Sequence, residues 1–366
     1  MGSMSRIAVC TALALGTLAV AASHASAASR AGTVYTSTNA GSGNAILAFD
    51  RAGDGSLRPA GSFSTGGDGA GAGLGSQGAL SLADHGGLLY AVNAGSNSIT
   101  AFSVRAHGLH LLGTTPSGGD EPISLTVHGN LLYVLDAGSG VISGFTGARD
   151  GQLAALGGST QPIAGSGPAQ VGFTPGGGAL VVSDKDTNTI DTFLLDSQGR
   201  AGAAQSNPSE GDTPFGFDFD RRGHLIVSEA FGGAPGASAL SSYAVTSAGT
   251  LETISPSVAD NQAAACWVQV TKNGRFAYTT NTGSGSISSY TVHRDGSIEL
   301  LDQVGADTGA GSTPTDLAES GSGRVLLALL PGTDSVASYR VGPHGRLASV
   351  DHVGGVPSTA AGLAAR

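Results

Sequence analysis

The chain has 366 residues, of which 60 are glycine, and its 17 Lys and Arg against 27 Asp and Glu give a formal net charge of −10. An acidic chain without a basic cluster is a poor partner for nucleic acid or an anionic membrane, so neither is expected. So much glycine can indicate low complexity, but here the glycines separate regularly spaced apolar segments, as turn residues do.

The first 27 residues are predicted to be a targeting segment outside the fold. Met1-Gly2-Ser3 resembles a vector-derived scar, and a charged Arg6, an apolar run over 7–22 and Ala25-Ser26-Ala27 follow. These are the features of a secretory signal peptide cleaved after Ala27. The alternative is a membrane anchor, but the run is shorter than the roughly 20 residues of a spanning helix. We expect a secreted, extracellular protein whose residues 28–366 form a single domain.

Cleavage would leave Cys266 as the only cysteine, so no disulfide within the mature chain is expected. We expect this thiol to be buried and unreactive. The mature protein is predicted to be a monomer that makes no membrane contact.

One pattern recurs seven times along the chain: an apolar strand, a polar turn with Asn or Asp and Gly, and a strand that ends in an aromatic residue. The copies begin at Val34, Leu89, Leu132, Leu180, Leu225, Phe276 and Leu326. The closing aromatic residues are Phe49, Phe102, Phe145, Phe193, Tyr243, Tyr290 and Tyr339. Their spacing of roughly 50 residues is typical of four-stranded propeller blades.

A further short strand, often opened by proline, precedes most copies. The segments start at Pro122, Pro168, Pro214, Cys266 and Pro314. The copy at Val34 has no such strand before it, whereas residues 357–363 fit the pattern and have no copy after them. The sequence therefore predicts an all-β, seven-bladed β-propeller with four-stranded blades. A C-terminal strand over 359–363 is predicted to join the N-terminal blade, residues 34–63, and to close the ring.

The repeated phrase, LYAVNAGSNSITAFSV from Leu89 and LYVLDAGSGVISGFTG from Leu132, resembles the seven-bladed lactonase family. That family includes 6-phosphogluconolactonase-like and carboxymuconate-cyclase-like proteins. The resemblance covers essentially the whole chain after residue 27 and implies hydrolysis or formation of a lactone on one face of the propeller. The His and Arg positions associated with the family's activity have no match here, so no catalytic residue is carried over.

Propeller connectivity sorts the turns onto two faces. Turns from strand 2 to strand 3, and from strand 4 to the next strand 1, share one face, which we call the top; the other turns share the bottom. The predicted top turns carry many carboxylates and one basic side chain, Lys185, whereas most arginines fall on the bottom. An acidic top would repel phosphorylated or carboxylated lactones. The expected ligand is therefore a small neutral molecule, such as a neutral lactone or a sugar.

Glu229 and Lys185 are the predicted catalytic residues. Glu229 opens the longest turn from strand 2 to strand 3, and neighbouring carboxylates can raise its pKa towards the range of a general base. Lys185 is expected to polarise a lactone carbonyl. The alternatives are a solvated turn carboxylate for Glu229 and an ion pair with Asp184 or Asp186 for Lys185.

The predicted ligand-binding residues lie at strand starts near the channel and in top turns. They are Gln170, Phe215, Trp267, Gln269, Asp316, Asp136 and Asp184. An aromatic side chain at a channel mouth can stack on a ring, although burial in the core is the alternative. For Gln170, Gln269 and Asp316 the alternative is hydrogen bonding to unpaired strand ends.

No metal or other cofactor is predicted. Residues 184–188 have the alternate oxygen spacing of some calcium loops but lack the glycine and distal glutamate of a complete one. No Ser-His-Asp set and no His cluster falls on the top. Two functions remain: a secreted lactonase with Glu229 as base, and a non-catalytic module that binds a cation, a glycan or a basic protein. The Gly-rich connection over 64–76 is either a site-building loop or a flexible tether.

Overall fold

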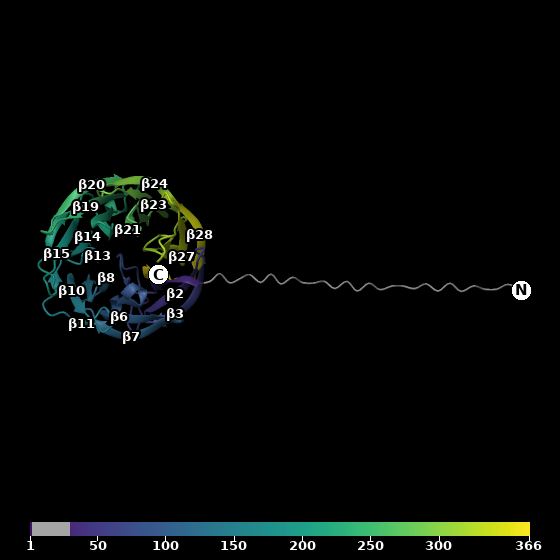
Figure 1. Cartoon of the computed structure of the whole chain (residues 1–366), viewed down its shortest axis with the longest axis horizontal. Coiled ribbons are helices and arrows are strands. Elements are labelled where there is room, and N and C mark those ends of the chain that lie inside the picture. The colour runs from purple at the N-terminus through teal and green to yellow at the C-terminus, as the bar shows by residue number, and fades with distance from the viewer. Residues whose placement is uncertain (2–29) are drawn as a thin grey trace.

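The computed structural model describes Met1 and residues 30–366, so the predicted signal peptide lies outside the described residues. Seven antiparallel sheets form a ring around a central channel (Figure 1). In each sheet, consecutive strands run from the channel outwards. The predicted all-β, seven-bladed propeller is confirmed.

We number the blades along the chain, starting with the blade that contains both the first and the last strand. Blade 1 has β29 (Ala361–Ala365), β1 (Arg30–Ser37), β2 (Ala45–Ala52) and β3 (Leu57–Ser64). Blade 2 has β4 (Leu80–Ala83), β5 (Leu88–Asn93), β6 (Ser98–Arg105) and β7 (Gly108–Pro116). Blade 3 has β8 (Pro122–His128), β9 (Leu131–Asp136) and β10 (Val141–Thr146), and its outer position is split between β11 (Ala154–Ala155) and β12 (Gln161–Pro162).

The other four blades repeat this order. Blade 4 has β13 (Pro168–Phe173), β14 (Ala179–Asp184), β15 (Thr189–Leu194) and β16 (Gln205–Pro208); blade 5 has β17 (Pro214–Phe219), β18 (His224–Glu229), β19 (Ala239–Val245) and β20 (Leu251–Ala259). Blade 6 has β21 (Ala265–Val270), β22 (Phe276–Asn281), β23 (Ser286–Val292) and β24 (Ile298–Asp307); blade 7 has β25 (Leu317–Glu319), β26 (Val325–Leu330), β27 (Ser335–Val341) and β28 (Leu347–Gly354). Four single 3₁₀ turns lie between strands: η1 (Asp84–Gly86), η2 (Ala94–Ser96), η3 (Phe231–Gly233) and η4 (Pro331–Thr333).

The second strand of each blade is buried on both faces because it packs against two neighbouring blades. Strand β26, with the sequence VLLALL, is buried along its whole length. Tyrosines of these strands reach the next blade: Tyr90 donates to the Ala148 carbonyl at 3.0 Å, and Tyr133 donates to the Gly199 carbonyl at 2.8 Å. Buried hydroxyls need such partners, so these bonds fix the position of one blade on the next.

The ring closes inside blade 1. Val34 pairs with Ala365 and Thr36 pairs with Leu363 across β1 and β29. The predicted closure is confirmed, with the strand two residues further along than the expected 359–363. Among the described residues, no helix is long and apolar enough to cross a membrane.

Candidate active site

A glycine-rich connection crosses the top of the channel. We call this segment, residues 65–79 between β3 and β4, the plug. Its middle is held from the far side of the ring, where Lys185 Nζ donates to the Gly75 carbonyl at 2.9 Å and Trp267 Nε1 donates to the Ser76 carbonyl at 2.8 Å. Of the two alternatives for this connection, these bonds support the site-building loop.

Side chains at one position of the inner strands link neighbouring blades around the channel. Ser124 of β8 accepts a bond from the Val171 N–H of β13 at 3.1 Å. Gln170 of β13 accepts from the Phe217 N–H of β17 at 2.7 Å and donates to its carbonyl at 2.9 Å. The equivalent residue of β17 is Gly216, which has no side chain with which to reach blade 6.

Gln77 of the plug supplies this missing bridge. Its amide accepts from the Val268 N–H of β21 at 3.0 Å and donates to the Val268 carbonyl at 2.8 Å. A Cβ atom on Gly216 would collide with Gln77 Oε1, so glycine at this position admits the plug. The plug is therefore an integral part of the inner ring.

A cavity of about 240 Å³ opens on the top, between the plug and blades 6, 7 and 1. We call it the top cavity; its lining residues are Gly73, Leu74, Gly75, Ser76, Trp267, Thr313, Thr315, Asp316, Pro331, Ser358, Ala360 and Ala361. Two of the predicted ligand-binding residues, Trp267 and Asp316, meet here. No residue of this lining set is basic, and Asp316 is its one acid.

A second cavity, of about 260 Å³, lies in the channel on the other side of the plug. This channel cavity is lined in part by Gln77, Gln170, Asp218, Gln269 and Asp316. It brings three predicted residues, Gln170, Gln269 and Asp316, together. Each of these side chains also bonds an inner strand or a neighbouring carboxylate, since Gln269 Nε2 donates to Asp218 Oδ2 at 3.0 Å and the Gly362 N–H donates to Asp316 Oδ2 at 3.0 Å.

Asp316 contributes to both cavities and is only 3% exposed. Burial raises the pKa of Asp316 to about 7. Burial also raises the pKa of Asp218 to about 7. Asp218 lines the channel cavity but not the top cavity. A carboxyl group with a pKa near neutrality is suited to general base chemistry.

Lys185 and Phe215 lie beside the plug. Lys185 Nζ lies 4.8 Å from the centroid of the Phe215 ring, which in turn lies 5.0 Å from the Trp267 ring at a tilt of 54°. Burial lowers the pKa of Lys185. Lys185 is not one of the residues lining the top cavity, and its ammonium group is engaged with the plug.

Glu229, Asp136 and Asp184 lie in the seams between blades, each at the end of a second strand, and all three are fully buried. Glu229 accepts bonds from the Gly211 N–H at 2.9 Å and from the hydroxyls of Ser241 and Ser257. Burial raises the pKa of Glu229. None of the three residues lines the top or the channel cavity, so a catalytic role for Glu229 has no geometric support there.

Glycines of the preceding top loop fit closely onto these acids. A Cβ atom on Gly165 would collide with Asp184, one on Gly211 would collide with Glu229, and one on Gly119 would lie 2.7 Å from Asp136 Cβ. The acid at the strand end and the glycine of the preceding loop therefore pack directly against each other where two blades meet.

Asp218 was missed by the sequence reasoning, although the signal was present. Ser124, Gln170 and Gly216 occupy the third position of their first strands, and Asp218 occupies the fifth, which faces the same way in a strand of period two. Counting two residues on from Gly216 would have identified it. In the part of the chain that the structure describes, no three His, Cys, Asp or Glu side chains gather as a metal site requires.

Comparisons with known proteins agree with the propeller fold and identify the family of the chain. A family model described as "Lactonase, 7-bladed beta-propeller" matches residues 43–173 and 235–361, which is more than half of the chain. No curated protein matched the sequence. A protein from Lactobacillus plantarum is similar in structure, with a TM-score of 0.74 and 17% identity over 92% of this chain and 100% of that one.

Two further solved structures carry names that bear on activity. A putative 6-phosphogluconolactonase from Bacteroides uniformis has a TM-score of 0.72 and 18% identity, over 90% of this chain and 98% of its own. A periplasmic gluconolactonase from Pseudomonas aeruginosa has a TM-score of 0.68 and 17% identity over the same shares. The ring of seven four-stranded blades defines the class of protein, a seven-bladed β-propeller. The chain belongs to the seven-bladed β-propeller lactonase family.

Proposed function

We propose that the protein hydrolyses a small neutral lactone in the top cavity, with Asp316 as the general base. The observation that carries this proposal is the shared position of Asp316, at the boundary of the top and channel cavities, together with its pKa of about 7. An exposed carboxylate with an ordinary pKa is a weaker base, and burial is what makes Asp316 effective.

In the proposed reaction the Asp316 carboxylate takes a proton from water, and the water oxygen bonds to the lactone carbonyl carbon. The bond between that carbon and the ring oxygen then breaks, and the ring oxygen leaves with a proton to give a hydroxy acid. The hydroxyls of Thr313 and Ser358 line the same cavity and can donate to the carbonyl oxygen as it becomes negative. Trp267 forms a flat wall for the ring.

The charge of the top supports a neutral substrate. The residues that line the top cavity include one carboxyl group and no Lys, Arg or His. A phosphate group there would face Asp316, and the Lys185 ammonium group behind Gly75 is already bonded to the Gly75 carbonyl, so the phosphate is unfavourable in this partly buried site. Exposed carboxylates in top turns, such as Asp186 and Asp212, would add to the repulsion.

Substitution of Asp316 tests the proposal against a matched control. Asp316→Asn keeps the shape and one acceptor for the Gly362 N–H, so we expect a folded protein whose lactone hydrolysis falls by roughly a hundredfold or more. Asp218→Asn removes a carboxyl group of the same raised pKa that lines the channel cavity alone, and its activity should stay near the parent's. Hydrolysis of glucono-δ-lactone and of its 6-phosphate is followed in a pH-stat.

The activity of the parent protein should rise with pH through about 7, because Asp316 must ionise to act as a base. Full activity in Asp316→Asn would refute its role as base, and faster turnover of the phosphorylated lactone would refute the neutral substrate. Binding of a lactone to Trp267 without any turnover would favour the second function, a non-catalytic binding module.

We also propose that the protein acts outside the cytoplasm. Residues 1–27 have the pattern of a signal peptide, and the similar gluconolactonase of Pseudomonas aeruginosa is described as periplasmic. Mass spectrometry of secreted protein should give a chain that begins near Ala28. A chain that retains residues 1–27 in the membrane fraction would favour the anchor.

A further inference from the structure

The bottom of the ring has a cavity of about 890 Å³, more than three times the volume of the top cavity. We call it the bottom cavity. Its lining residues come from blades 1, 2, 6 and 7, at the mouth of the channel: Arg30, Ala31, Gly32, Leu82, His85, Gly86, Ala106, Lys272, Gly321, Ala365 and Arg366. This volume is sufficient for a molecule the size of a sugar acid.

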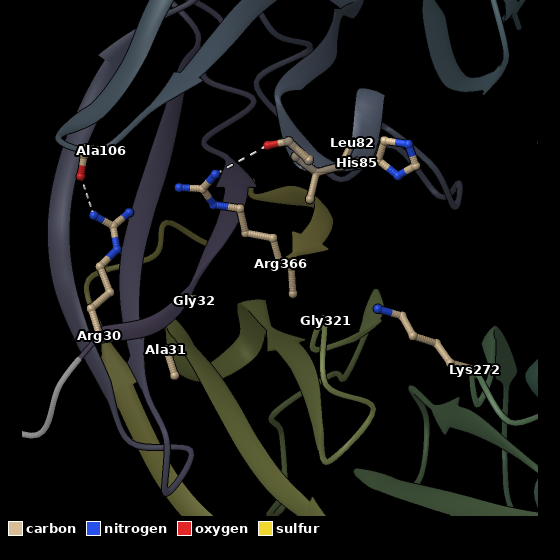
Figure 2. A pocket seen from close by; sticks show the side chains of 11 residues that line it. Arg30, Ala31, Gly32, Leu82, His85, Ala106, Lys272, Gly321 and Arg366 are labelled. Carbon is tan, nitrogen blue, oxygen red and sulfur yellow. Dashed lines mark hydrogen bonds between the residues drawn. The ribbon is translucent and has the colours of Figure 1, made fainter.

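Three cationic side chains and a histidine surround the bottom cavity (Figure 2). Figure 2 shows Arg30 and Lys272 on opposite sides, with Arg366 between them. Arg366 donates to the Gly86 carbonyl through one terminal nitrogen, whereas Arg30 donates to the Ala106 carbonyl and the Thr33 hydroxyl and pairs with Asp50. Lys272 Nζ donates to the Ser320 carbonyl at 3.1 Å.

Cationic side chains outnumber carboxylate side chains near this cavity. Asp50 pairs with Arg30 at 2.8 Å, and Glu319 accepts from the backbone N–H of Lys272 at 2.7 Å. Burial raises the pKa of Glu319, against the backbone N–H and the positive charge of Lys272, which lower it. Among residues 30–366, no ion pair to a carboxylate involves Lys272 or Arg366.

A buried guanidinium lies directly behind the wall of the cavity. Arg51 is 3% exposed, and its terminal nitrogens donate to the carbonyl oxygens of Ala52 and Ala31 and, at 3.5 Å, to the terminal carboxyl oxygen of Arg366. Arg51 Nε has no hydrogen-bond partner among the described residues. This guanidinium adds positive charge directly behind the cavity wall, which favours an anion bound nearby.

We propose that the bottom cavity is a binding site for a small organic anion, a carboxylate or phosphate of sugar size. Arg366 can offer paired N–H groups to the planar or tetrahedral oxygens of such a group, and Arg30 and Lys272 add positive charge from the walls on either side. The top cavity has the reverse character, with one acid and no base. The two ends of the channel therefore select ligands of different charge, and this site does not depend on the proposed lactone chemistry.

Isothermal titration of the protein with gluconate, glucose 6-phosphate and glucose tests the site. At least one of the two anions should bind, and comparison of the two shows whether the site prefers a carboxylate or a phosphate. Glucose should not bind up to about 10 mM. The affinity should fall several-fold as salt rises from about 0.02 M to about 0.5 M, because the charges around the cavity are screened. Absence of binding by both anions, or equal binding of glucose, would overturn the proposal.

Variants locate the site. Lys272→Gln and Arg366→Gln should each weaken anion binding by roughly fivefold or more, and Lys272→Arg should restore it. Arg149→Gln, which removes an exposed arginine of another bottom turn, should bind as the parent does. Asp316→Asn should leave anion binding unchanged and Lys272→Gln should leave lactone hydrolysis unchanged, so the two proposals can fail separately. Equal losses in Arg149→Gln and Lys272→Gln would show that the anion recognises only the overall charge.

Discussion

Asp316 connects the candidate active site to the closure of the ring. Its carboxylate lines both cavities and accepts a bond from Gly362 in the closing strand β29. A carboxyl group in an unfolded chain has a pKa of about 3.9, whereas that of Asp316 is about 7 in the folded protein. The folded state therefore holds this proton more tightly than the unfolded state does.

This difference makes stability depend on pH. Because the folded protein binds more protons, the contribution of Asp316 is most favourable below about pH 4 and is lost as pH rises through about 7. Asp316→Asn removes the titration, so we expect the free energy of unfolding to be higher than the parent's by about 1 to 3 kcal/mol at pH 8, with a flatter profile from about pH 5. Urea denaturation across this range measures both.

Asp54→Asn is the control, because Asp54 is exposed and Ser56 lowers its pKa, so it stays ionised across the range. This variant should keep the parent's slope. A slope in Asp316→Asn equal to the parent's would mean that Asp316 is ionised throughout.

Glu229 is a second test at the residue scale. Glu229→Gln keeps an acceptor for the Gly211 N–H, and its amide can donate to the Ser257 hydroxyl, so we expect nearly unchanged stability and lactone hydrolysis. Glu229→Ala leaves a buried N–H and two hydroxyls unpaired and should lose about 2 to 4 kcal/mol. Thermal melts and activity assays of both variants decide the matter; lost activity in Glu229→Gln at an unchanged melting temperature would restore Glu229 as the base.

The sequence predicted which residues are polar at strand ends but not what they contact. Glu229 replaces the repeated Asn or Asp at the strand end and Asp184 keeps it, yet both also accept a bond from a glycine N–H of the preceding loop. Backbone donors leave no side-chain signature in a sequence. Trp267 and Asp316 both line the top cavity, and each lies near the start of an inner strand, a place that the repeat indicates.

The plug is the element that most changes the site. Its glycine content was visible in the sequence, but its position was not, because the side chains that hold Gly75 and Ser76 are those of Lys185 and Trp267, 110 and 191 residues away along the chain. Gln77 takes the place of a blade 5 side chain that Gly216 lacks. The glycine at position 216 is visible in the sequence, but the bridge it fails to make can be recognised only once the bridging roles of Ser124 and Gln170 are known.

Gln77→Ala should loosen the plug. It removes two bonds to Val268, which should lower the free energy of unfolding by about 1 to 3 kcal/mol and let water reach the indole of Trp267. Trp267 is the only tryptophan in the chain, so its emission reports on the plug directly, and we expect a shift to longer wavelength.

Gln170→Ala is the matched control, because Gln170 makes the same pair of bonds to Phe217 without belonging to the plug. It should be destabilised to a similar degree with unchanged Trp267 emission. Equal emission shifts in the two variants would mean that the loss of any inner bridge, rather than release of the plug, exposes Trp267.

At the scale of the whole molecule, the repeat predicted the number of blades and the closure. Two inner strands are displaced from their expected positions: the closing strand, and the strand expected from Pro314, which is observed as β25 (Leu317–Glu319). The expected strand 359–363 is observed as β29 (Ala361–Ala365), because the pairing slips between Thr36 and Ser37 and the Thr359 hydroxyl instead donates to the Thr38 carbonyl. Such a slip depends on local backbone geometry that residue types specify weakly.

Closure predicts that the ring folds as one unit. Removal of residues 354–366 takes away β29, exposes the edge of β1 and uncovers Val34, which is buried in the parent. A free edge and an exposed apolar blade face cannot be compensated locally, so we expect loss of cooperative unfolding and aggregation on heating. Removal of Arg366 alone is the control, because it retains the whole of β29 and should unfold cooperatively near the parent's temperature. Calorimetry and light scattering compare the three proteins. If the longer deletion still unfolded cooperatively at the parent's temperature, the ring would be stable without its closing strand.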